Sequence, residues 1–157
     1  MRRFNLDLDQ TQLGERYADP QTAFAFQAPA DWVRVAEELP EPPEDSELLP
    51  LAAFRHEQSN ATCIVLRIDL QQSVSSYVSL IRSSFKQAQV LSEELRVDGV
   101  EVVLVRIIDR ASIVLKAIVM EGERAVVEID YVAPRAAFPD LAAAIDSSLA
   151  SIRTRVD

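Results

Sequence analysis

Two glycines in the second half of the chain interrupt an almost continuous series of β-branched residues, and they constrain the fold more than any other feature. Gly99 follows Asp98, and Gly122 follows Glu121. An Asp-Gly pair between alternating apolar residues is a strong hairpin signal, because Gly adopts the positive φ of a tight turn at no steric cost. The pattern predicts an antiparallel meander of four strands, at residues 90 to 97, 100 to 109, 112 to 121 and 123 to 132.

The rarity of certain residue types argues against most enzymes. The chain contains three Gly, one His and one Cys. Three scattered glycines cannot form the Gly-rich loop that binds phosphates or dinucleotides. One His and one Cys supply two of the four ligands that zinc sites use. We therefore expect no metal, no cofactor and no catalytic activity.

Length and charge narrow the class of protein further. The 157 residues match the usual size of one domain, and a net charge of -9 disfavours binding to nucleic acid or to anionic membranes. The longest apolar stretch, residues 113 to 120, contains Lys116 and is much shorter than the roughly 20 residues of a membrane helix. Asp7 and Asp9 lie where a signal peptide would be apolar, and a lone Cys63 cannot form an internal disulfide. We expect a cytoplasmic protein without stable membrane insertion.

The chain is predicted to be a polar leader followed by one domain. Residues 1 to 20 show little periodicity, so no element is predicted there, and residues 21 to 157 form the domain. An acidic, Pro-rich segment at about residues 37 to 50 can bury little apolar surface and is expected to be an exposed loop.

The remaining elements follow from periodicity and capping. Two short strands are expected at residues 23 to 28 and 32 to 35, around a corner at Pro29. Residues 51 to 57 and 62 to 69 form a hairpin, residues 73 to 88 an amphipathic helix capped by Ser73, and residues 139 to 152 a helix with Pro in its first turn.

Two of the predicted strands are apolar on both faces. Residues 100 to 108 and 113 to 120 carry few charges on either side, so each face of the sheet must be covered. Helices on one face and an oligomer partner on the other would do this. The last strand instead alternates apolar residues with charged ones such as Glu128 and Asp130, so one of its faces should be wet or should meet a polar partner.

The segment from residue 24 to residue 32, an apolar strand, a Pro-containing corner and Trp32, resembles the opening of the PsbP-like superfamily. The order of elements from residue 23 to residue 152 is similar to that family's order. The resemblance implies an α+β fold, an antiparallel β-sheet flanked by two main helices in an α/β/α sandwich. We interpret Trp32 as a structural anchor, because it follows directly after the Pro-containing corner. Members include a photosystem accessory protein, a Ran-binding import factor and the Eag-type chaperones of type VI secretion effectors, none of which is chiefly an enzyme.

His56 and Cys63 are the one pair to consider for catalysis. If a four-residue turn pairs Glu57 with Thr62, His56 lies opposite Cys63 with about 5 Å between their Cβ atoms. A charged His could then activate the thiolate. No third group or oxyanion feature accompanies them, and Cys is commonly a small buried apolar residue. We interpret Cys63 as structural.

Charged residues alternate with apolar ones on several predicted strands, and we interpret them as one stripe on the sheet. The stripe is either a solvated face, whose ion pairs contribute roughly 0.2 to 1 kcal/mol each, or a docking face in which charges select the partner. On the second interpretation the candidate partner-binding residues are Val65, Arg67, Arg106, Lys116, Val126, Glu128 and Asp130.

The expected function is therefore a non-catalytic protein-binding module, an adaptor or chaperone of a bacterial system, that holds a polypeptide on its sheet face. A secreted effector is one candidate partner, and a second copy of the chain, giving a homodimer, is another. The alternative is a small-molecule-binding protein or minor enzyme with a cleft between the sheet and a helix.

Overall fold

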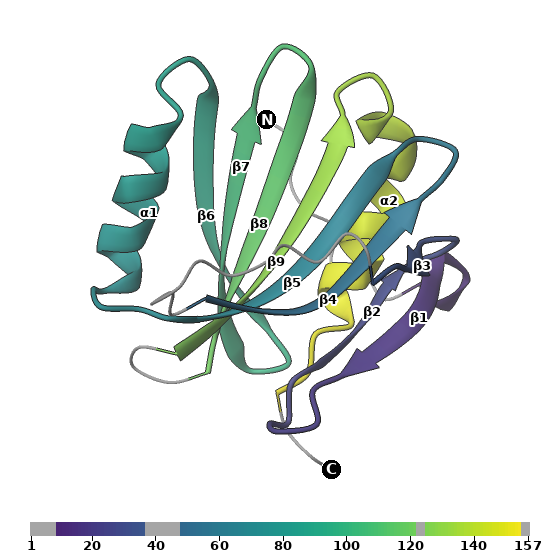
Figure 1. Cartoon of the computed structure of the whole chain (residues 1–157), viewed down its shortest axis with the longest axis horizontal. Helices are drawn as coiled ribbons and strands as arrows, with labels where there is room; N and C mark the ends of the chain where they lie inside the picture. Colours follow the sequence, from purple (N-terminus) through teal and green to yellow (C-terminus); the bar gives the residue numbers. More distant parts are fainter. Residues whose placement is uncertain (1–8, 37–47, 122–124, 155–157) are drawn as a thin grey trace.

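The computed structural model describes residues 9 to 36, 48 to 121 and 125 to 154, which form two antiparallel sheets and two α-helices (Figure 1). The elements in chain order are η1 (Gln10–Gln12), β1 (Leu13–Ala18), β2 (Ala25–Pro29), β3 (Val33–Arg34), β4 (Leu48–His56), β5 (Ala61–Asp69), α1 (Val74–Ser84), β6 (Gln89–Val97), β7 (Val100–Ile108), β8 (Ser112–Met120), β9 (Ala125–Pro134) and α2 (Phe138–Ala150).

The main sheet has seven strands in the order β3-β4-β5-β9-β8-β7-β6, all antiparallel to their neighbours. Strands β6 to β9 form the predicted meander. Asp98 and Gly99 connect β6 to β7 with φ of 52° and 78°, the two positive values that a type I′ hairpin turn requires. Gly122, the other predicted turn residue, lies outside the described residues.

Both helices begin where the sequence predicts. The Ser73 side chain accepts a hydrogen bond from the backbone N–H of Ser76 and caps α1. Pro139 occupies the first turn of α2, where its missing N–H is not needed. α1 ends at Ser84, earlier than the predicted residue 88, because residues 85 to 88 turn toward the start of β6.

Each face of the main sheet is covered by one helix. α2 lies on the face that carries Leu104, Leu115 and Ile129, and its Ile145 is fully buried in that core. α1 lies on the opposite face, where Ile81 packs in a cluster with Val105, Ile107, Ile118 and Val126. The prediction that each face is covered is confirmed. The suggestion that helices cover only one face is wrong, because α1 and α2 pack on opposite sides.

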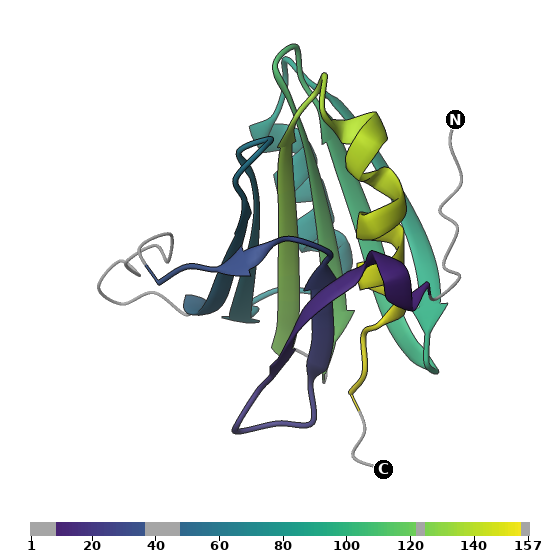
Figure 2. The same cartoon turned by 90° about the vertical axis from the view of Figure 1, so that its right-hand side faces the viewer.

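The predicted leader contributes to the fold. η1 and β1 lie within residues 1 to 20, and β1 pairs with β2 in a second, two-stranded sheet. The periodicity is weak there because only Tyr17 of β1 is buried, against Phe24 and Phe26. Figure 2 shows this hairpin beside α2. A Cβ atom on Gly14 would lie 2.7 Å from the Pro29 carbonyl oxygen, so the hairpin needs Gly at that position.

The corner at Pro29 and the following strand connect this hairpin to the main sheet. Trp32 is 2% exposed and its ring lies 6.4 Å from that of Tyr131, so it anchors the corner in the α2-side core. β3 is only two residues long, and β4 starts at Leu48, inside the segment predicted as a loop. The rest of that acidic segment, residues 37 to 47, lies outside the described residues.

Candidate functional site

The seven residues predicted to form one docking stripe lie on two opposite faces of the sheet. Lys116, Glu128 and Asp130 are on the α1 face together with Val126. Val65, Arg67 and Arg106 are on the α2 face, as the buried register neighbours of Val65 and Arg106 show: Ile129 lies beside Val65, and Leu115 beside Arg106. The interpretation of a single stripe is therefore wrong. Alternation in each strand defines two faces, but the cross-strand register decides which face each set joins.

Val65 and Val126 do not face outward. Both side chains are 0% exposed, Val65 in the α2-side core and Val126 beneath α1. Glu128 is 1% exposed, so the polar face of β9 is not wet in its central part. Glu128 instead accepts hydrogen bonds from two side chains of the same chain, those of Lys116 and Tyr77.

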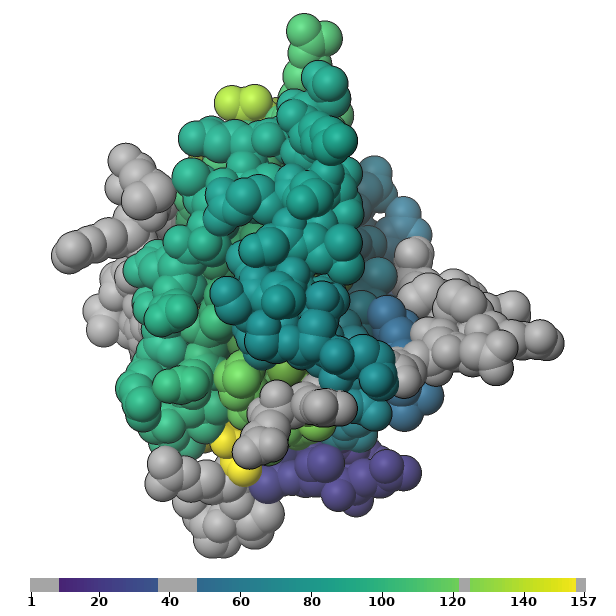
Figure 3. All heavy atoms as spheres, turned by 90° about the vertical axis from the view of Figure 1, so that its left-hand side faces the viewer, coloured from purple at the N-terminus to yellow at the C-terminus, as the bar shows by residue number. Residues whose placement is uncertain are grey.

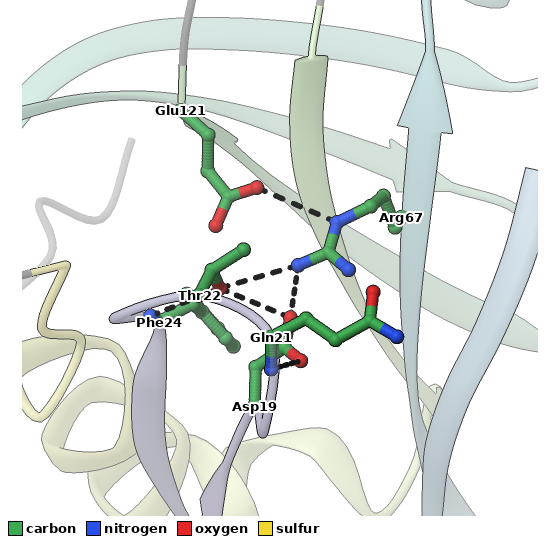
Figure 4. Close-up of polar contacts among 6 residues, drawn as sticks. All are labelled: Asp19, Gln21, Thr22, Phe24, Arg67 and Glu121. Carbon is green, nitrogen blue, oxygen red and sulfur yellow. Dashed lines mark hydrogen bonds and ion pairs between the residues drawn. The ribbon is translucent and has the colours of Figure 1, made fainter.

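Arg67 ties the β1–β2 turn to the end of the main sheet (Figure 4). Its guanidinium donates to the Asp19 carboxylate and to the Thr22 hydroxyl, and its Nε lies 3.5 Å from Glu121 Oε2. Burial disfavours the charged form of Asp19, but hydrogen bonds from the Gln21 N–H, Arg67 and Thr22 outweigh it and lower the Asp19 pKa. This is a structural contact between two sheets.

Lys116, Glu128 and Asp130 form a polar cluster with Tyr77 of α1, in which Glu128 is buried and the other three residues are half-buried. The Lys116 Nζ lies 3.1 Å from Glu128 Oε2 and 3.0 Å from Asp130 Oδ2. The Tyr77 hydroxyl donates to Glu128 Oε1 at 2.5 Å. The cluster therefore fixes α1 onto the sheet through a side chain that the sequence analysis did not assign to it.

The electrostatics of this cluster are dominated by burial. Burial, followed by repulsion from Glu128, raises the pKa of Asp130 well above its ordinary value. Burial would lower the Lys116 pKa, but attraction to Asp130 and Glu128 outweighs it and raises the Lys116 pKa. Burial and Glu128 also raise the Tyr77 pKa. Lys116 is charged and Tyr77 is a neutral donor at neutral pH, a stabilising arrangement with no activated nucleophile.

The predicted pairing of His56 with Cys63 is wrong. β4 and β5 pair with His56 opposite Ala61 and Phe54 opposite Cys63, because the four-residue turn lies at residues 57 to 60, one residue earlier than predicted, and this changes the cross-strand partner of each residue by two positions. His56 Nδ1 is hydrogen-bonded to the Ser59 hydroxyl at 2.7 Å. Cys63 is buried, and burial raises the pKa of its thiol. Both observations fit a structural Cys63.

A groove of about 960 Å³ lies between α1 and β6, on the side of the molecule shown in Figure 3. It is open to solvent rather than enclosed. Its floor is apolar, since Val74 and Val78 of α1 approach Val103 and Met120 of the sheet there. The rim is polar, formed by Ser75, Ser79 and Arg82 on α1 and by Ser92, Glu94 and Arg96 on β6.

The groove runs beside an edge of the main sheet. β6 is the last strand in the sheet order, and in the part of the chain that the structure describes no strand pairs with its outer side. A charged, polar surface on a long edge strand is the usual protection against unwanted pairing. The sequence carries this signal, because three polar residues in a row, Ser92, Glu93 and Glu94, break the alternation of this strand. Hydrophobic periodicity alone does not reveal this signal.

The described residues show no cluster suited to a metal ion and no helix suited to a membrane span. Residues 9 to 36, 48 to 121 and 125 to 154 contain no group of three or more His, Cys, Asp or Glu arranged to hold a metal ion. Within the same ranges, neither helix has the length and apolar character needed to cross a membrane.

Comparison with known proteins identifies the fold. The solution structure of the cyanobacterial PsbP protein CyanoP from Synechocystis sp. PCC 6803 is similar, with a TM-score of 0.61 over 90% of this chain and 92% of that chain, at 13% identity. The chain therefore has the PsbP-like α+β fold that residues 24 to 32 predicted. At this identity the likeness concerns the fold alone.

A crystal structure from Bacteroides thetaiotaomicron VPI-5482 is less similar, with a TM-score of 0.45 at 12% identity, covering 92% of this chain and 50% of that chain. No family model and no curated protein sequence matches the chain.

Proposed function

We propose that this chain is a non-catalytic protein-binding module, an adaptor or chaperone of a bacterial system, that holds a polypeptide partner in the groove between α1 and β6. A secreted effector is one class of partner within this proposal. The docking place differs from the predicted stripe, since those residues are divided between two faces and are largely covered by the chain's own helices.

The observation that carries the proposal is the groove itself. It combines an apolar floor at Val103 and Met120 with a rim of charged and hydroxyl side chains, and it is open to solvent. Apolar surface surrounded by polar residues is typical of protein interaction sites. The groove also lies against a free sheet edge, which can supply backbone hydrogen bonds to a partner.

The second candidate function is that of a small-molecule-binding protein, and it would use the same groove between α1 and β6. The sequence predicts, as the alternative, a cleft between the sheet and a helix, and the groove lies between β6 and α1. Arg82, Glu94 and Arg96 would then be the polar groups that orient the ligand. A small molecule would bury less of this open surface than a polypeptide would.

Filling the groove tests the proposal. Ser79 lines the groove from α1 and is exposed, so Ser79→Trp should block it without disturbing the core. Ser83→Trp, one turn further along and outside the groove lining, is the matched control. The immobilised full-length chain should retain a polypeptide from an extract of its own host, the control should retain it equally, and Ser79→Trp should lose it at an unchanged melting temperature.

Two results would contradict the binding-module proposal. One is retention that is equal for all three forms, because the groove would then not be the docking place. The other is a chain that retains no polypeptide but is stabilised against heat by a metabolite, with that stabilisation lost in Ser79→Trp. The second result would establish the small-molecule alternative.

A further inference from the structure

The outer edge of β6 presents unpaired backbone groups at alternate residues. Val97 and Val100 close the two-residue turn at Asp98 and Gly99, and the closing pair of such a turn is hydrogen-bonded across the hairpin. Odd-numbered residues of β6 therefore direct their N–H and C=O groups toward β7. The even-numbered residues 90, 92, 94 and 96 direct theirs outward.

Arg82 of α1 confirms this direction and closes one end of the edge. Its guanidinium donates to the Val90 carbonyl oxygen at 3.0 Å and to the Ser92 hydroxyl at 3.2 Å. The Val90 carbonyl can be reached from α1 only because it points away from β7. The backbone groups of Glu94 and Arg96 have no such partner among the described residues, so the open part of the edge is its second half.

The charge along this open part is negative. Arg96 is paired with Glu101, at 3.4 Å between Arg96 Nη2 and Glu101 Oε1. Glu93 and Glu94 are exposed and form no ion pair with any described residue. Glu94 shares the groove side of the strand with Val103, its register partner on β7, so an unpaired carboxylate stands beside the apolar floor.

We propose that the groove receives an extended segment of the partner polypeptide, which pairs with β6 from about Ser92 to Arg96 as an added strand and places a basic side chain against Glu94. This assignment rests on the proposed function and specifies its mode of binding. An added strand alternates its side chains, so an apolar residue next to the basic one in the same face would point into the groove between β6 and α1. Backbone hydrogen bonds would supply affinity, and the carboxylate would supply selectivity.

A free edge beside a helix favours a strand over a helical ligand. A helix satisfies its own backbone groups and would leave those of Glu94 and Arg96 exposed to solvent. An extended segment pairs with them directly. Ser75 and Ser79 line the α1 side of the groove with small side chains, which leaves room for the side chains of such a segment.

Two synthetic peptides test the mode of binding with the full-length chain. One has ten residues, with Lys and Val in turn on one face of the extended peptide and Thr on the other, and the other has Glu in place of Lys. The Lys peptide should shift the amide resonances of β6 and protect the Glu94 and Arg96 amides from hydrogen exchange, and the Glu peptide should bind at least tenfold more weakly.

Two variants separate backbone pairing from charge. Glu94→Pro removes an outward N–H without removing a bond to β7, so it should abolish binding of the Lys peptide. Glu94→Arg should reverse the preference and favour the Glu peptide. Glu15→Arg, an exposed site on β1, is the matched charge control and should leave the preference unchanged. If Glu94→Pro does not fold, the reversal by Glu94→Arg still decides the question.

The outcomes distinguish this inference from the proposed function. Shifts confined to residues away from β6, or equal binding of both peptides, would overturn the strand and charge assignment while leaving a protein-binding role in place. No binding of either peptide up to millimolar concentration would overturn the inference as well. Dimerisation of the free chain that is lost in Glu94→Pro would assign the edge to a second copy of this chain, against the assignment made here.

Discussion

At the scale of single residues, Asp19 is the acceptor that joins the two sheets. Its side chain is 2% exposed and binds Arg67, the Thr22 hydroxyl and the Gln21 N–H. Asp19→Asn should reduce the free energy of unfolding by about 2 kcal/mol, because it removes the charge that compensates a partly buried Arg67. Urea unfolding at neutral pH measures this loss. Asp69→Asn, at an exposed carboxylate on β5, is the control and should change little.

The pH dependence of the same variant checks the cause. The folded-state pKa of Asp19 is lowered from 3.8, so its contribution to stability is present above that value and is lost as the pH falls through the lower folded pKa. The stability difference between wild type and Asp19→Asn should therefore be largest at neutral pH and shrink below about pH 4. A difference that stays constant down to pH 2 would contradict the electrostatic explanation.

At the scale of elements, α1 is attached to the sheet by apolar packing and by one buried hydrogen bond. Tyr77→Phe removes the hydroxyl that donates to Glu128 Oε1 and leaves a carboxylate oxygen unpaired in a site that is 1% exposed. The expected loss of stability is about 1 to 2 kcal/mol. Hydrogen exchange should become faster in α1 and remain unchanged in α2, which lies on the other face.

Tyr17→Phe provides the control for this variant. The Tyr17 ring is 5% exposed, and its hydroxyl has no hydrogen bond to a described residue, so its removal should leave stability almost unchanged. Equal losses for the two variants would show that the ring environment, rather than the bond to Glu128, accounts for the effect. Faster hydrogen exchange in both helices would show that α1 does not unfold locally on its own.

At the scale of the whole molecule, the N-terminal hairpin and the main sheet share one core. Phe26 of β2 packs edge-on against Phe54 of β4, with ring centroids 5.9 Å apart, and Ser148 of α2 donates to the Gln27 carbonyl oxygen at 2.6 Å. We expect one cooperative unfolding transition. The fluorescence of Trp32, at the corner between β2 and β3, and far-ultraviolet circular dichroism should have the same midpoint in urea. An earlier fluorescence transition would mean that the corner unfolds separately.

The sequence by itself determined the elements and their local geometry. The Asp98-Gly99 turn, the Ser73 cap and the Pro139 start of α2 depend on conformational preferences and hydrogen bonds within a few residues. The alternation of β5 and β9 depends only on the pleat of a strand. These local signals, with the corner at residues 24 to 32, were enough to predict the PsbP-like fold that the structure has.

Only the tertiary structure decided how those elements meet. The pattern in each strand defines two faces but does not show which faces of neighbouring strands coincide. The prediction of one stripe places Lys116 and Arg106 on the same face, whereas the β7–β8 register places them on opposite sides. Glu128 can be buried because the Tyr77 hydroxyl of α1 donates a hydrogen bond to it. No charge pattern within β9 predicts that contact. The groove exists because α1 packs on the sheet beside β6 and covers only part of it. The edge of β6 is open because β6 is the last strand in the sheet order. Long-range packing sets these features, since their free energy depends on residues distant in the chain.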